Sequence, residues 1–79
     1  MHWYYQRLEK TQNGYVYKYS TENNALDGLI ECDLKSGDMW VVRPSEADKD
    51  SEYRQGRAMR SFYYVIRENF PEERHVCCG

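Results

Sequence analysis

The chain has 79 residues, and 11 lysines and arginines against 13 aspartates and glutamates give it a formal net charge of -2 at pH 7. This length fits one small domain, and the slightly acidic balance excludes a globally basic nucleic-acid binder while leaving a local basic face open. Aromatic residues make up 15% of the chain and include eight tyrosines, so large rings supply much of the volume available for burial. The composition therefore predicts one folded domain, residues 1–79, with a thin aromatic core.

The cysteines number three, and their spacing does not resemble the disulfide framework of a secreted protein. No apolar leader resembles a signal peptide, and no run approaches the ~20 apolar residues that a membrane span needs. These features predict a cytoplasmic protein with free thiols and no membrane association.

Residues 2–10 and 15–20 form the first predicted hairpin. The Asn-Gly pair at 13–14 is typical of a two-residue type I′ turn, in which both central residues have positive φ. This turn sets Leu8 opposite Tyr19. The returning strand carries tyrosines at every second position, and we expect these rings to face the core because the intervening side chains are less apolar.

The second predicted hairpin begins with an alternation of apolar and acidic residues from Ile30 to Leu34. A three-residue loop at 35–37, with Gly in the left-handed position, sets Cys32 opposite Trp40 and Ile30 opposite Val42. This register places Trp40 and Val42 on the core face. The strand ends at a proline, which cannot donate a ladder hydrogen bond.

Residues 51–69 form the predicted helix, capped by Asp50 or Ser51 and ended by Pro71. At about 100° per residue, one side of this helix is apolar and should cover the sheet. That side carries Ala58, Met59, Phe62, Tyr63, Ile66 and Phe70. The fold class is therefore α+β, with a four-stranded antiparallel sheet of two hairpins within residues 2–44, one C-terminal helix on one face, the order β-β-β-β-α, and a short tail at 70–79.

A second face of the predicted helix combines arginines and tyrosines. Arg57, Arg60 and Arg67 project within about 80° of one another, and Tyr53 and Tyr64 lie in the same sector. Such surfaces stack on bases and bind phosphate or carboxylate groups. The alternative is a solvated helix face whose arginines pair with neighbouring acids.

The C-terminal segment His75 to Cys78 holds an imidazole and two adjacent thiols. These are soft ligands for zinc or copper if Cys32 or His2 lies close, but adjacent cysteines are poorly placed for two corners of a tetrahedral site. No metal site is therefore expected. Cys77 and Cys78 are candidate reactive thiols, because basic neighbours lower the pKa of a thiol, and the alternative is an ordinary tail in which they act as small hydrophobic residues.

Recognisable catalytic motifs are missing from the sequence. There is no phosphate-cradling glycine loop, no Gly-x-Ser-x-Gly and no His-Glu-x-x-His. The acidic segment 48–52 lacks the glycine and the distant glutamate of a calcium loop. We therefore expect no enzymatic activity and no cofactor.

The width of the predicted sheet points to self-association. Four strands at ~4.8 Å spacing make a sheet of about 19 Å, whereas one helix is only ~10–12 Å across, so part of the sheet stays open for a second copy or another protein. Candidate anchors for that contact are Trp3, Tyr17, Met39 and Trp40. We therefore expect a cytoplasmic, non-enzymatic protein-interaction module that forms a homodimer. The alternative is a small regulator that binds nucleic acid or an acidic partner through the Arg/Tyr helix face.

Overall fold

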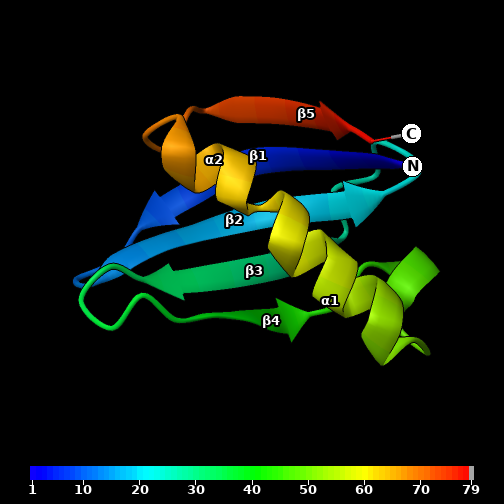
Figure 1. Cartoon of the computed structure of the whole chain (residues 1–79), viewed down its shortest axis with the longest axis horizontal. Helices are drawn as coiled ribbons and strands as arrows, with labels where there is room; N and C mark the ends of the chain where they lie inside the picture. The colour runs from blue at the N-terminus through cyan, green and yellow to red at the C-terminus, as the bar shows by residue number, and fades with distance from the viewer. Residues whose placement is uncertain (79) are drawn as a thin grey trace.

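The computed structural model describes residues 1–78 and shows an antiparallel sheet crossed on one face by a helix (Figure 1). The elements in chain order are β1 (His2–Lys10), β2 (Gly14–Thr21), β3 (Gly28–Asp33), β4 (Met39–Arg43), the short 3-10 turn η1 (Glu46–Asp48), α1 (Glu52–Ser61), α2 (Tyr63–Arg67) and β5 (Glu73–Cys77). The α+β class, the antiparallel sheet and the C-terminal helix are confirmed. None of the helices in the described residues is long and apolar enough to cross a membrane.

The sheet has five strands in the order β4-β3-β2-β1-β5, so the prediction of four strands is wrong. The fifth strand, β5, comes from the predicted tail 70–79, whose last residue, Gly79, lies outside the described residues. After α2, Asn69 and Phe70 adopt φ values of 62° and 57°. This left-handed turn sends the chain back along β1, where Trp3 pairs with Val76.

The first hairpin has a longer turn than the Asn-Gly pair predicts. Lys10 pairs with Tyr15, so four residues separate the two partners. Gly14 does not have the positive φ that a type I′ turn requires, since among the described residues the only glycine with positive φ is Gly37. The register is irregular at Leu8, which is left without a partner. Tyr5 lies opposite Tyr19, and the predicted pairing of Leu8 with Tyr19 is wrong.

The second hairpin is shifted by one residue from the predicted register. The backbone N–H of Asp33 donates to the carbonyl of Asp38, which leaves a loop of four residues in place of three. Glu31 therefore pairs with Trp40, and Cys32 pairs with Met39. Because side chains alternate between the two faces, this shift puts Met39 on the core face and leaves Trp40 41% exposed on the other.

The predicted helix 51–69 is interrupted once, at Phe62, and α1 and α2 run diagonally across one face of the sheet (Figure 1). Ser51 caps it, since its side-chain oxygen accepts a hydrogen bond from the Arg54 N–H. The apolar side differs from the predicted one, because Tyr63 is exposed and Val65 is buried in its place. The buried apolar residues between the layers are Trp3, Tyr5, Tyr17, Tyr19, Ile30, Cys32, Ala58, Phe62, Val65, Phe70 and Val76.

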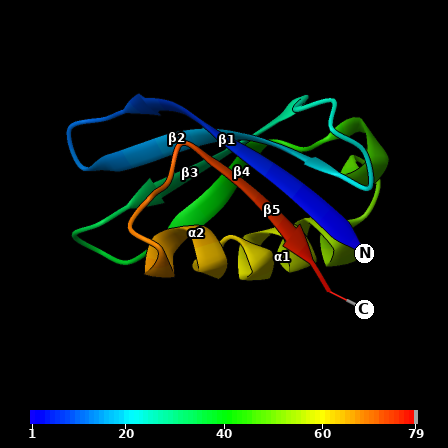
Figure 2. The ribbon, with the colours of Figure 1, turned by 90° about the horizontal axis from the view of Figure 1, so that it is seen from above.

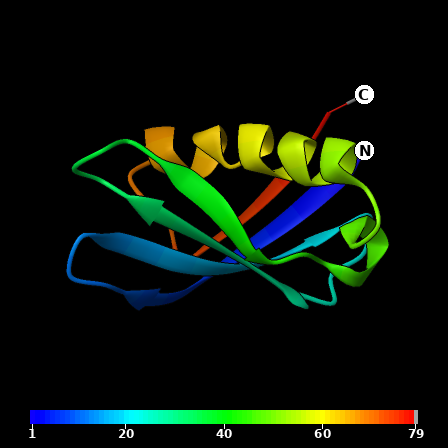
Figure 3. The same cartoon turned by 90° about the horizontal axis from the view of Figure 1, so that it is seen from below.

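Figures 2 and 3 show the two layers edge-on, with the helix against one face of the sheet. No helix or strand of residues 1–78 covers the opposite face, which we call the outer face. Met1 and Cys78 lie at the same end of the molecule, where β1 and β5 run side by side (Figure 1) and the Cys78 N–H donates to the Met1 carbonyl. The fold thus offers two kinds of accessible surface, the outer face of the sheet and the solvent side of the helix.

Candidate functional site

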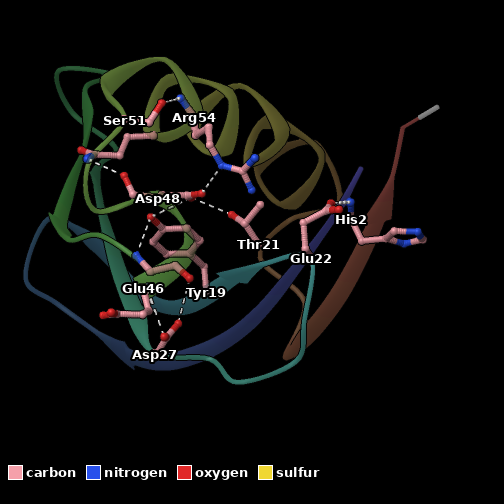
Figure 4. Close-up of polar contacts among 11 residues, drawn as sticks. His2, Tyr19, Thr21, Glu22, Asp27, Glu46, Asp48, Ser51 and Arg54 are labelled. Carbon is pink, nitrogen blue, oxygen red and sulfur yellow. Dashed lines mark hydrogen bonds and ion pairs between the residues drawn. The ribbon is translucent and has the colours of Figure 1, made fainter.

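A buried aspartate lies where η1 meets the sheet (Figure 4). The Asp48 carboxylate is fully buried and accepts hydrogen bonds from the Thr21 hydroxyl at 2.6 Å and from Arg54 Nε at 3.1 Å. A buried charge needs such partners, because desolvation without them would be costly. Asp48 is therefore a structural residue that ties η1 and α1 to β2.

A second carboxylate extends this network to the β2–β3 connection (Figure 4). Asp27 accepts hydrogen bonds from the Ser45 hydroxyl at 2.9 Å and from the Glu46 N–H at 3.1 Å. Partial burial works against the charged form, but these hydrogen bonds outweigh it and lower the pKa of Asp27. The Tyr19 hydroxyl accepts from the Ser45 N–H, and burial raises the pKa of this phenol to about 12. These groups are satisfied within the chain and hold the elements together.

The predicted interaction anchors fall in different places. Trp3 is 1% exposed and Tyr17 is fully buried, so neither ring is accessible to a partner in this fold. Met39 packs against the core from β4 and is partly buried. Trp40 is the anchor that remains accessible, on the outer face.

The outer face is partly apolar. Alternation along the strands places Tyr4, Val16, Leu29 and Trp40 on this face, away from the core residues that flank them. The Tyr4 ring stacks on His75 of β5, with ring centroids 4.4 Å apart and an interplanar angle of 4°. The same face carries Lys18 and Glu31 on adjacent strands, so both signs of charge are present. The outer face therefore combines apolar and aromatic side chains with charges of both signs.

The predicted Arg/Tyr helix face is present on the solvent side of α1 and α2. The Arg57 guanidinium lies 6.0 Å from the Tyr53 ring centroid, and the Arg67 guanidinium lies 4.7 Å from that of Tyr64. Arg60 is exposed between them. Within residues 1–78, no carboxylate oxygen lies within 4.0 Å of a guanidinium nitrogen of these three arginines. The ion pairs expected under the alternative, a solvated helix face, are therefore not found for these three arginines within residues 1–78.

A hollow of about 180 Å³ lies beside the middle of this face, between the helix and β1. Its lining residues are Trp3, Arg57, Arg60, Ser61, Tyr64 and Cys78. The sequence pattern brings Arg57, Arg60 and Tyr64 together, because these positions recur at helical spacing. The sequence pattern does not predict that Trp3 and Cys78 also line the hollow. Both residues reach it because β1 pairs with β5.

The two candidate reactive thiols are separated by the sheet. Cys78 lines the hollow on the helix side, whereas Cys77 lies on the outer face with its Sγ 4.0 Å from His2 Nε2. His2 Nδ1 in turn lies 2.9 Å from His75 Nε2. Cys32 is buried in the core, remote from this cluster. In the described part of the chain, no three His, Cys, Asp or Glu side chains converge on a metal site.

Comparisons with known proteins give no relative on which these surfaces could be mapped. No protein-family model, no curated protein and no solved structure matches the chain.

Proposed function

We propose that this protein is a non-enzymatic protein-interaction module that self-associates through the outer face of its sheet. The single observation that supports this proposal most is that a five-stranded sheet carries a helical layer on one face only. Soluble monomers rarely leave a large apolar patch exposed, and the outer face presents Tyr4, Val16, Leu29 and Trp40.

The area of this face suits a homodimer. Five strands at ~4.8 Å spacing span about 24 Å, and strands of five to nine residues are roughly 17–30 Å long. Covering the face on two copies buries on the order of 1,000 Å² in total, which reaches the lower range of specific interfaces. A two-fold contact uses the same patch twice, and Lys18 and Glu31 allow opposite charges to meet across it.

The test is the molar mass in solution measured by light scattering over a range of protein concentrations. We expect a dimer, twice the 9.5 kDa of the chain, at tens of micromolar. Trp40→Lys places a charge at the accessible anchor and should weaken dimerisation about tenfold or more. Tyr63→Lys is the matched control, because Tyr63 is equally an exposed aromatic residue but lies on α2. A monomeric wild type, or equal effects of both substitutions, would refute the proposal.

A second candidate function is the binding of an anionic partner, nucleic acid or an acidic protein, through the Arg/Tyr helix face. The observation that favours it is the set of three arginines without a carboxylate within 4.0 Å among residues 1–78. Two of these guanidinium groups lie over aromatic rings, which restrains them while leaving their N–H donors free for a ligand.

This function predicts a steep dependence on salt, because neutralising phosphates releases counterions. The measurement is binding of a short single-stranded oligonucleotide and of a polyglutamate peptide at increasing ionic strength. The double substitution Arg60→Gln with Arg67→Gln should abolish binding, whereas Lys10→Gln with Lys35→Gln removes the same charge elsewhere and should preserve it. Salt-independent binding, or equal losses in both double variants, would contradict this assignment.

A further inference from the structure

The hollow between α1 and β1 gathers hydrogen-bond donors and lacks acidic residues. Arg57 and Arg60 line it from α1, together with Ser61 of α1 and Tyr64 of α2. These positions are three or four residues apart along the helix, so their side chains share one side. The lining therefore carries two positive charges and no carboxylate to balance them.

Trp3 lines the hollow from the sheet. Its side chain is 1% exposed, and its indole Nε1 is buried without a hydrogen-bond partner among the described residues. A buried N–H without an acceptor is unfavourable, and native proteins seldom leave one in that state. Because Trp3 lines the hollow, a ligand that enters there lies against the indole, and the buried N–H reports on its binding.

The Arg57 guanidinium is restrained before any ligand arrives. The Arg57 guanidinium lies 5.5 Å from the Trp3 ring centroid and 6.0 Å from that of Tyr53, so it is flanked by two rings. Arg60 is exposed, and neither arginine has a carboxylate oxygen within 4.0 Å in residues 1–78. Little ordering of Arg57 is needed on binding, and no internal ion pair has to be broken first.

We propose that this hollow binds a phosphate group, either as inorganic phosphate or as a phosphate monoester. Two guanidinium groups match the charge of a phosphate, and several donor residues along one side of the helix suit its several acceptor oxygens better than a planar carboxylate. A volume of about 180 Å³ has room for the group and the first atoms of an ester. The inference rests on the second proposed function, since it names the anion-binding point within the Arg/Tyr helix face.

The indole N–H resonances of the two tryptophans provide the test by nuclear magnetic resonance of ¹⁵N-labelled protein. Inorganic phosphate and methyl phosphate are titrated separately at constant ionic strength, and a Trp40→Phe variant assigns the two signals. We expect the Trp3 signal to shift in a saturable manner with both probes. The Trp40 signal should stay in place, because Trp40 lies on the outer face.

Arg60→Gln should weaken the binding of both probes about tenfold, since a charge-assisted hydrogen bond is lost from an exposed residue that the fold does not need. Lys35→Gln removes the same charge from the β3–β4 loop and should leave the affinity unchanged. Saturation with inorganic phosphate alone would restrict the site to the free anion, and saturation with methyl phosphate alone would assign it to esters.

The proposal is overturned if the Trp3 signal does not move, if both indole signals move together, or if Arg60→Gln and Lys35→Gln behave alike. Oligonucleotide binding measured on the same samples distinguishes a failure of the phosphate site from a failure of the anion-binding function. If the oligonucleotide binds but the Trp3 signal does not shift with phosphate, the helix face binds anions but the hollow is not the site. If neither ligand binds, the anion-binding function itself is wrong.

Discussion

Replacing Phe62 with alanine tests the core on which both proposed surfaces depend. Phe62 is fully buried at the junction of α1 and α2. Its ring centroid lies 5.2 Å from that of Tyr17 at an interplanar angle of 77° and 5.5 Å from that of Tyr5 at 63°. Phe62→Ala removes both edge-to-face contacts and leaves a cavity, which costs ~3–5 kcal/mol for a buried phenylalanine. A chain of 79 residues has a total stability of about 4–12 kcal/mol, so this single change removes a large part of it.

The assay is urea unfolding followed by far-ultraviolet circular dichroism. With an m-value of about 1 kcal/mol per molar urea, the midpoint should fall by about 3–5 M, or the variant should be unfolded without urea. Tyr63→Ala is the control, because this neighbouring aromatic residue is 51% exposed and should cost less than about 1 kcal/mol. An unchanged midpoint for Phe62→Ala, or equal losses for both variants, would refute the packing of the helix on the sheet.

Two glycines should respond to alanine in opposite directions, and burial should make stability fall at alkaline pH. The added Cβ of Gly56→Ala meets open space in the helix, so this substitution should stabilise the fold by up to about 1 kcal/mol. Gly14→Ala would bring a Cβ within 1.9 Å of the Cys32 carbonyl oxygen and should destabilise the fold. Urea midpoints that move in the same direction for both variants would contradict this prediction. Burial raises the pKa of Tyr17 and Tyr19 from 10.0 to about 12. The unfolded chain therefore loses these protons first, so their contribution to stability is complete below pH 10 and declines as the pH rises toward 12. Phenolate absorbance and circular dichroism followed together check it, and ionisation of these two phenols near pH 10 in the folded protein would contradict it.

Local sequence patterns were sufficient for the class of the fold. Asn and Gly residues between alternating apolar residues indicate hairpins, and Asp50 or Ser51 is predicted to cap a segment with helical periodicity, because these preferences act over a few neighbouring residues. The Arg/Tyr helix face follows from the same periodicity. Each of these features depends only on the spacing of residues within one element.

The registers of the two hairpins could not be predicted from such local patterns. One additional residue in the loop after Asp33 moves Trp40 to the outer face and Met39 to the core. An unpaired Leu8 has a comparable effect in the first hairpin. Because strand side chains alternate with a period of two, a change of one residue reverses the face, and the packing of the whole core decides which register is preferred.

The sequence by itself determined the balance of charge, the antiparallel α+β class, the capped helix and its cationic face, because composition and short-range periodicity are properties of the chain alone. The tertiary structure decided that β5 joins β1, that Trp3 and Tyr17 are buried, and that one hollow contains Trp3, Arg57 and Cys78. The pairing of β1 with β5 and the contact of Trp3 with Arg57 join residues more than fifty positions apart. The strength of such contacts comes from burial and hydrogen bonding that exist only once the sheet and the helix have packed.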